Sequence, residues 1–241
     1  SRPLADIVAE VEALARRGIQ EAVLVSQDTL AWGKDRRGEG DIGDLLRALS
    51  DTAMPWIRPM YLHPAHVNDR LIEKLARARI VPYLDMPVQH ADDGLLRAMR
   101  RAVTARRMKD VVAAFRAAIP DLTLRTTVLV GFPGETEAAF QALLDFVEEV
   151  RFERLGVFTY SPEDGTPALG MPGEVPREVA EERAAIVQDC QDRIAFERVK
   201  SLYGTVQQVL VDGPSEDPAF RWEGRLAGQA PEIDGVVYLR G

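Results

Sequence analysis

Short apolar runs alternate with amphipathic stretches along the first 160 residues of the chain. The runs are rich in β-branched and aromatic residues, which predicts buried strands. The stretches between them repeat apolar residues at helical spacing. The predicted strands are 22–25, 56–62, 81–86, 122–130 and 152–160, and the predicted helices include 3–17, 71–78 and 108–118. Because helices separate the strands, the pattern indicates parallel βαβ units.

Polar residues cluster after each predicted strand, which is typical of a βα barrel or half-barrel whose mouth carries the site. The fold class is therefore α/β. The first predicted element is a helix, although a βα series begins with a strand. We therefore expect that one barrel strand precedes Ser1.

Residues 122–137, LTLRTTVLVGFPGETE, form the most informative βα unit. An apolar strand runs into a glycine turn at 131–134, and Thr136 follows as a helix N-cap. Glycine lets a backbone approach a ligand closely, and Glu135 can accept hydrogen bonds. The alternative is an ordinary βα loop without a ligand, because one glycine turn is weak evidence.

The last third of the chain has a different pattern. Residues 172–176 are typical of a linker, residues 179–203 are predicted to form a long helix, and strands are predicted at 206–211 and 236–239. We therefore divide the chain into a barrel core (1–172), a linker with a closing helix (173–204) and a small β domain (205–241).

The composition, 46% hydrophobic and 28% charged over 241 residues, is that of a soluble globular chain. No apolar run approaches the ~20 residues that span a bilayer, and we predict a cytoplasmic protein without a membrane partner. The single cysteine, Cys190, excludes a cysteine-only metal or iron–sulfur site within this chain. Its helical spacing with Val187 and Ile194 predicts a packed core thiol.

Several segments together resemble the radical S-adenosylmethionine methylthiotransferases. The segments are SQDT at 26–29, YLDMPVQH at 83–90, GFPGET at 131–136, FTYS at 158–161 and PEIDG at 231–235, in the order of the family. Two of these segments, SQD at 26–28 and QHA at 89–91, resemble the sequences of the enzymes that modify ribosomal protein S-twelve rather than those of the tRNA-modifying enzymes. The family's CxxxCxxC motif is absent, so the chain resembles a fragment that begins after the cluster loop.

The resemblance implies a partial (βα)6 TIM-like barrel without its first strand, followed by an incomplete TRAM-like β domain. It implies S-adenosylmethionine as cofactor, with 4Fe–4S clusters in the full-length protein but none in this fragment. The implied reaction adds a methylthio group to the β-carbon of an aspartate. The alternatives are a tRNA methylthiotransferase and a cluster-free barrel that serves as a binding module. A CxxxCxxC motif just upstream of Ser1 would exclude the binding module.

The resemblance places candidate cofactor-binding residues at the barrel mouth, while catalytic residues stay unknown. Gln27 and Gln89 can hold ribose and amino-acid groups, or they can cap loops. Arg125, a charge in an apolar strand, can hold the methionine carboxylate, or it can pair with Asp85 or Glu135. The remaining candidates are His90, Val130, Gly131, Glu135 and Tyr160.

Charge and histidine patterns bear on the partners. His63, His66 and His90 lack a metal-ligand spacing, and we predict no metal site. The basic run at 97–109 is predicted to be a solvated helix face, with RNA contact on the ribosome as the alternative. Residues 205–241 hold six acidic and three basic residues, a local charge of −3. This acidity favours a basic ribosomal protein as partner over RNA. A reductant protein is the further partner that the resemblance implies.

Overall fold

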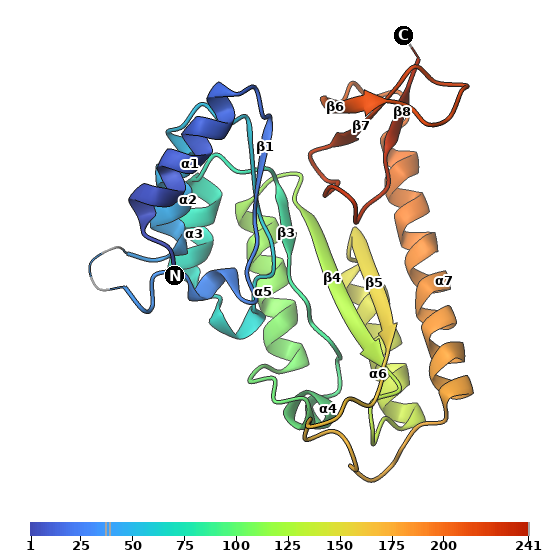
Figure 1. Cartoon of the computed structure of the whole chain (residues 1–241). Coiled ribbons are helices and arrows are strands. Elements are labelled where there is room, and N and C mark those ends of the chain that lie inside the picture. The colour runs from blue at the N-terminus through green and yellow to red at the C-terminus, as the bar shows by residue number, and fades with distance from the viewer. Residues whose placement is uncertain (37, 39, 241) are drawn as a thin grey trace.

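Five parallel strands form the centre of the molecule (Figure 1). The computed structural model describes residues 1–36, 38 and 40–240. All five predicted strands are confirmed; the first is shifted by one residue, and the other four are shorter than the apolar runs that predicted them. They are β1 (Glu21–Leu24), β2 (Trp56–Pro59), β3 (Tyr83–Asp85), β4 (Thr123–Val130) and β5 (Arg154–Thr159).

The strands follow one another in chain order around a half-barrel. β1 pairs with β2, and β3, β4 and β5 pair in sequence, all in parallel. Two backbone hydrogen bonds bridge the halves: the Val81 N–H donates to the Ile57 carbonyl at 3.0 Å, and the Leu62 N–H donates to the Asp85 carbonyl at 2.8 Å. The predicted α/β half-barrel is confirmed.

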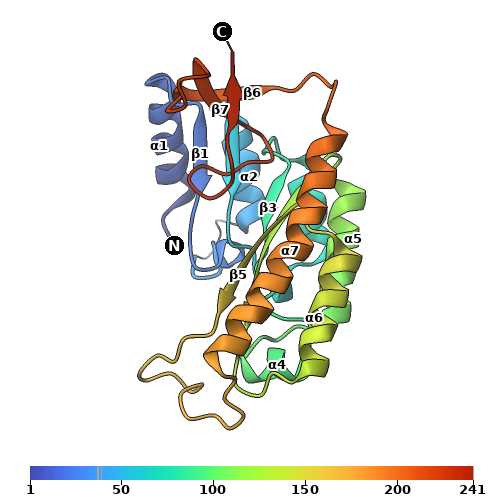
Figure 2. The ribbon, with the colours of Figure 1, turned by 90° about the vertical axis from the view of Figure 1, so that its right-hand side faces the viewer.

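Helices cover the outer face of the strands, as Figures 1 and 2 show together. Their apolar sides pack on the sheet in one core that includes Phe115, Phe146 and Phe152. In α6, the predicted N-cap is confirmed, because the Thr136 hydroxyl accepts from the Ala139 N–H at 3.2 Å. The helices are α1 (Leu4–Arg16), α2 (Ile42–Ser50), α3 (Asp69–Arg77), α4 (Asp93–Ala98), α5 (Ala105–Ala118), α6 (Glu137–Val150) and α7 (Arg177–Ser201), with short 3-10 turns at Thr29–Ala31 and Pro64–His66.

The long helix α7 leads from the barrel to a small antiparallel β domain. This domain contains β6 (Val209–Pro214), β7 (Trp222–Leu226) and β8 (Val237–Leu239). The strand predicted at 206–211 begins later, at Val209, and β7 was not predicted. Two charges, Glu223 and Arg225, interrupt β7 and hide its alternation, although Arg225 is buried.

The β domain covers the amino-terminal ends of the strands (Figure 1). Ala230 packs there with Trp56, Met60 and Tyr83 inside the barrel. The Tyr83 hydroxyl donates to Asp234 at 2.8 Å, and burial raises the pKa of Tyr83 above its ordinary value. This end of the barrel is therefore closed.

A buried ion-pair network joins the two domains at the same end. The Glu21 carboxylate contacts Arg58 of β2 and Arg225 of β7, each at 2.7 Å. Arg225 also pairs with Asp212 at 2.8 Å. Since buried charges are stable only when paired, the β domain supplies a partner that the barrel needs.

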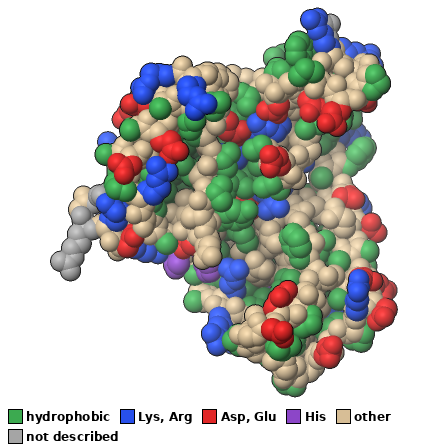
Figure 3. Space-filling model, viewed as in Figure 1, with side chains coloured by type: hydrophobic (Ala, Val, Ile, Leu, Met, Phe, Trp, Pro, Cys, Tyr) green, Lys and Arg blue, Asp and Glu red, His purple; other side chains and the backbone are tan. Residues whose placement is uncertain are grey.

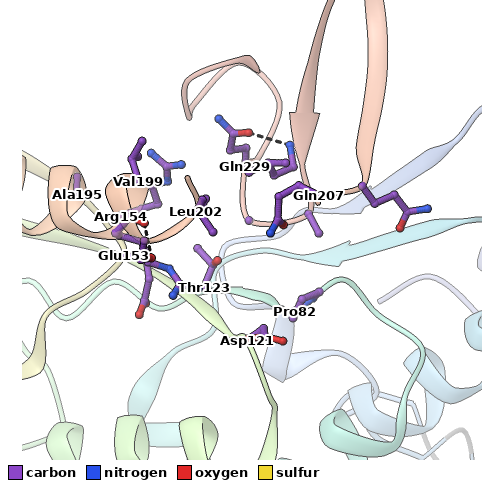
Figure 4. Close-up of a pocket in the computed structure, with 16 residues that line it drawn as sticks. Pro82, Asp121, Thr123, Glu153, Arg154, Ala195, Val199, Leu202, Gln207 and Gln229 are labelled. Atoms are coloured by element: carbon purple, nitrogen blue, oxygen red, sulfur yellow. Dashed lines mark hydrogen bonds between the residues drawn. The ribbon is translucent and has the colours of Figure 1, made fainter. Parts of the chain in front are cut away.

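A cavity of about 340 Å³ lies beside this junction (Figure 4). Strand starts, the end of α7 and the β domain each contribute to its wall. The labelled wall residues are Pro82, Asp121, Thr123, Glu153, Arg154, Ala195, Val199, Leu202, Gln207 and Gln229. The carboxyl ends of the strands lie away from it, so they are the open end of the barrel.

No helix within the described residues has both the length and the apolar composition to cross a bilayer.

Candidate functional site

The carboxyl ends of the strands surround a cavity of about 380 Å³, which we call the mouth. Each of the five strands, or the loop that follows it, contributes to the wall. The lining residues are Gln27, Tyr61, Leu62, His63, Pro87, Gln89, Arg101, Arg125, Thr127 and Phe158. Three predicted site residues, Gln27, Gln89 and Arg125, therefore lie in one cavity.

The pleat of β4 decides which of its residues face the mouth. Arg125, Thr127 and Leu129 are partly exposed, whereas Thr126, Val128 and Val130 alternate with them and are buried. Val130 is 0% exposed and packs in the core with α6. Its side chain points to the opposite face of the sheet from the mouth, so the structure does not bring it together with Gln27, Gln89 and Arg125. Leu129 is the apolar residue on the mouth side.

Two residues with left-handed backbones stand at adjacent strand ends. Tyr61 has φ +57° after β2, and Gln89 has φ +71° after β3. The Gln89 N–H donates to the Thr127 carbonyl at 2.9 Å, and the Leu129 N–H donates to the Gln89 carbonyl at 2.7 Å. Such backbone strain concentrates at functional sites, where the surrounding structure holds it. These bonds fix Gln89 at the rim of the mouth.

Gln27 follows β1 and is exposed, and its neighbour Asp28 fixes the loop. Asp28 accepts from the Leu30 N–H at 3.1 Å, which caps a short helical turn. The other Asp28 oxygen contacts His66 Nδ1 at 2.5 Å. This anchoring holds Gln27 beside the mouth.

Arg125 pairs with Asp85 across neighbouring strands, with 3.1 Å between Nη1 and Oδ1. One of the two alternatives from the sequence, a salt bridge to Asp85, is therefore present. Burial raises the pKa of Asp85, and the Arg125 charge opposes that rise. Because Asp85 also raises the pKa of Arg125 against its burial, the guanidinium stays charged. Arg125 also donates to the Thr127 hydroxyl at 3.3 Å and still lines the mouth.

Glu135 and His90 lie together inside the protein, with both side chains 0% exposed. Glu135 accepts from the Gly131 N–H at 2.5 Å, from His90 Nε2 at 3.1 Å and from Arg183 of α7 at 3.0 Å. His90 Nδ1 accepts from the Asp92 N–H, so the ring proton lies on Nε2. In this arrangement the two side chains hold the glycine turn and do not reach the mouth.

Gly131 and Tyr160 lie on the α7 side of the turn. Gly131 has φ +77°, and a Cβ there would stand 2.5 Å from the Ala180 Cβ. The Tyr160 ring meets Phe132 edge to face at 5.3 Å. Gly131, Pro133 and Tyr160 line a separate cavity of about 660 Å³. The glycine is therefore required for packing against α7.

The remaining histidines and the cysteine form no metal site in the described part of the chain, which holds no suitable group of three His, Cys, Asp or Glu side chains. Burial lowers the pKa of His63, and the nearby Arg101 charge lowers it further. Cys190 is 3% exposed, as the sequence predicts for a core thiol, and burial raises its pKa.

Sequence reasoning missed seven residues of the mouth: Tyr61, Leu62, His63, Pro87, Arg101, Thr127 and Phe158. Thr127 stands two positions after Arg125 in one strand, so strand periodicity alone could have found it. Phe158 is 58% exposed, which is unusual for an aromatic residue in a strand. Its side chain therefore contributes exposed apolar surface to the wall of the mouth.

Comparison with known proteins agrees with this geometry. The Radical SAM superfamily model matches residues 1–147, more than half of the chain. The chain belongs to the radical SAM superfamily. A TRAM domain model matches residues 204–241, which confirms the predicted kind of β domain.

Curated proteins similar to this chain are named ribosomal protein uS12 methylthiotransferase RimO. The protein from Syntrophus aciditrophicus is 44% identical over 100% of this chain and 54% of its own length. Those from Myxococcus xanthus and Anaeromyxobacter sp. are 46% and 47% identical over 99% of this chain and 50% and 51% of their lengths. The chain thus spans about half the length of the curated relatives it matches.

Solved structures show the same radical SAM fold. The methyltransferase TsrM from Kitasatospora setae superposes with a TM-score of 0.56 at 18% identity, over 90% of this chain and 38% of its own. Methylornithine synthase (PylB) gives 0.52 at 13% identity, over 76% and 53%. At these identities the likeness supports the fold alone.

Proposed function

We propose that this chain is the core of a methylthiotransferase that modifies an aspartate of ribosomal protein uS12. The observation that carries the proposal is the identity of 42–47% to RimO proteins over essentially the whole chain. The tRNA branch is disfavoured because the curated relatives described above are named for uS12.

S-adenosylmethionine fits the residues of the mouth. Gln27 and Gln89 offer amide donors and acceptors for ribose and amino-acid groups, and Arg125 offers a cation for a carboxylate. Tyr61 and Phe158 provide aromatic surface for the adenine. When bound, the cofactor supplies the radical that abstracts hydrogen from the substrate carbon.

The other predicted site residues act on the cofactor indirectly in this proposal. Glu135 and His90 hold the Gly131 turn in place, and Tyr160 packs behind it through Phe132. A fixed turn keeps the carboxyl end of β4 in position, and with it Leu129, which lines the cavity beside the mouth. Their role is positioning, because their side chains do not face the cavity.

The residues of this chain do not fit a 4Fe–4S cluster, which needs several thiolates close together. Cys190 lies buried on α7, where its sulfur contacts Glu148 at 3.9 Å. We therefore assign no step of the reaction to cluster chemistry within residues 1–241. The resemblance places the cluster cysteines upstream in the full-length protein.

The charge of the β domain supports a basic protein as substrate. Two of its acidic side chains are engaged within the protein. Asp212 pairs with Arg225, and Asp234 accepts a hydrogen bond from the Tyr83 hydroxyl. The charges that remain are Glu216, Asp217, Glu223 and Glu232 against Arg221 and Arg240, a surface balance of −2. An RNA-binding surface needs an excess of Lys and Arg to displace counterions. A basic ribosomal protein is instead attracted to an acidic surface.

The proposal also covers the setting of the reaction. The protein would act in the cytoplasm, contact the ribosome or free uS12, and receive electrons from a reductant protein. The relatives' names support the uS12 part of this assignment.

The test is an anaerobic assay of the full-length protein, reconstituted with iron and sulfide, on purified uS12 and on tRNA. We expect the mass of uS12 to rise by one methylthio group in place of hydrogen, at an aspartate, with no change in tRNA. A methylthio group on tRNA alone would move the assignment to the tRNA branch. Binding at two salt concentrations should show salt-sensitive association with uS12.

A further inference from the structure

Arg101 is a cation that the fold directs into the mouth. It follows α4, which is fixed by the buried Leu95 and Leu96. Arg100 takes a left-handed backbone, φ +57°, and the Arg101 N–H then donates to the Leu96 carbonyl at 2.7 Å. The turn ends α4 and brings Arg101 into the wall of the mouth, next to Gln89. Lys and Arg side chains stand beside the histidines at the lower edge of the central hollow (Figure 3).

Arg101 has no protein partner among the described residues. No carboxylate of the described residues lies within ion-pair distance of the Arg101 guanidinium. The guanidinium also makes no hydrogen bond to any described residue. Burial lowers the pKa of Arg101, and no neighbouring carboxylate opposes that effect. Two other members of the basic run have partners: Arg107 donates to the Val67 carbonyl, and Lys109 pairs with Glu149. Arg97, Arg100 and Arg106 are exposed to solvent, whereas Arg101 is partly buried. A half-buried cation without a partner is costly unless a ligand supplies the anion.

The charges of the mouth leave Arg101 uncompensated. Only two lining residues are always charged, Arg101 and Arg125, and Arg125 already has an ionic partner in Asp85. The lowered pKa of His63 keeps that ring neutral near pH 7. The lining therefore carries one unpaired positive charge, that of Arg101, which faces the open cavity.

We propose that Arg101 binds the side-chain carboxylate of the substrate aspartate and selects aspartate over its amide. The inference rests on the proposed function, which makes an aspartate the target. S-adenosylmethionine is the poorer match, because its carboxylate stands beside its own ammonium and its sulfonium adds a positive charge. A side-chain carboxylate brings one negative charge with no cation attached.

Arg101 also lies where a substrate would enter. It lines a second, shallower cavity of about 260 Å³ together with Gln89, Phe132 and the loop after β5 at Thr166. A guanidinium shared by the mouth and this cavity can hold an incoming chain while its β-carbon faces the cofactor. The planar fork of arginine suits a carboxylate, and lysine lacks it.

The experiment measures binding of uS12 to the full-length protein in the presence of S-adenosylhomocysteine, which prevents turnover. Two uS12 proteins are compared, one with the target aspartate and one with asparagine in its place. The enzyme variants are Arg101→Gln, Arg101→Lys and, as a charge-matched control, Arg97→Gln on the exposed side of α4.

We expect the unaltered enzyme to prefer the aspartate form about 10- to 100-fold, as a charge-assisted hydrogen bond allows. Arg101→Gln should bring the two forms to within about twofold, Arg101→Lys should retain part of the preference, and Arg97→Gln should retain all of it. A preference that survives Arg101→Gln would overturn the proposal.

A parallel titration with S-adenosylhomocysteine alone separates the two sources of carboxylate. Arg101→Gln should leave its affinity within about twofold. A loss of cofactor affinity with the aspartate preference intact would assign Arg101 to the cofactor and refute the proposal. Failure of the proposed function would be visible earlier, because the unaltered enzyme would then bind neither form of uS12.

Discussion

Replacing Glu135 with glutamine tests whether the buried network behind the glycine turn stabilises the fold. Glu135 is the only carboxylate that the structure places in contact with both His90 and Arg183 in the described chain. Glutamine keeps the size and one acceptor oxygen but removes the charge. Arg183, whose side chain is 9% exposed, would then retain only the exposed Glu137 as an ionic partner, at 3.2 Å.

The expected loss follows from that imbalance. Breaking a buried ion pair leaves the remaining charge uncompensated and costs about 3–5 kcal/mol. For a chain of this size, each kcal/mol shifts the melting temperature by roughly 2–4 °C, so Glu135→Gln should lower it by about 6–20 °C. The control is Glu137→Gln, which breaks an ion pair to the same Arg183 from an exposed position. That change should cost only about 0–1 kcal/mol.

The assay is thermal and urea unfolding of both variants followed by circular dichroism, repeated at several pH values. Burial alone would raise the pKa of Glu135, but hydrogen bonds from His90 and Gly131 hold it below its ordinary 4.5. The stabilisation by the ionised Glu135 carboxylate is therefore complete above pH 4.5 and is lost as the pH falls through the lowered pKa of the folded state. The gap between the unaltered chain and Glu135→Gln should shrink in acid. Equal losses for the two variants at pH 7 would refute the reasoning.

Three further predictions concern packing, alkaline stability and iron. Gly131→Ala should lower the free energy of unfolding in urea by about 2–5 kcal/mol, because of the positive φ at Gly131 and the contact with Ala180. The control Gly165→Ala also has a positive φ but open space around it, and it should cost only about 1–2 kcal/mol. Because folding raises the pKa of Tyr83, its contribution to stability is complete below the pKa of about 10 that it has in the unfolded chain, and this contribution falls as the pH rises above that value. Thermal scans of Tyr83→Phe should show less of this alkaline loss. After anaerobic reconstitution, residues 1–241 should contain no stoichiometric iron, because Cys190 is their single thiol; the absorption band of a cluster would contradict this.

The elements of the fold could largely be predicted from the sequence. Alternation of apolar strands and amphipathic helices is a local signal, and it located β1 to β5 because each strand is buried on its helix side. The strand β7 was missed because its charged Arg225 is buried through contacts with Glu21, which lies about two hundred positions away. No local pattern reports such a partner.

The candidate site was only partly predictable for the same reason. A cation in an apolar strand correctly marked Arg125 as unusual, and the same signal at Arg58 in β2 was overlooked. Resemblance marked Glu135 and His90 without showing that they face each other across two βα loops, 45 positions apart. Their role depends on Arg183, which arrives from α7, so the sequence alone could not separate ligand contact from support of the turn.

The central claim is that the mouth at the carboxyl ends of β1 to β5 binds S-adenosylmethionine through Gln27, Gln89 and Arg125. The most direct test is calorimetric titration of the reconstituted full-length protein with S-adenosylmethionine, comparing the unaltered enzyme with Arg125→Ala and Gln27→Ala. Loss of the charge-assisted contact in Arg125→Ala should weaken binding by about 1.5–3 kcal/mol, and loss of the amide in Gln27→Ala by about 0.5–1.5 kcal/mol. Unchanged dissociation constants in both variants would contradict the account and leave Arg125 as a structural partner of Asp85.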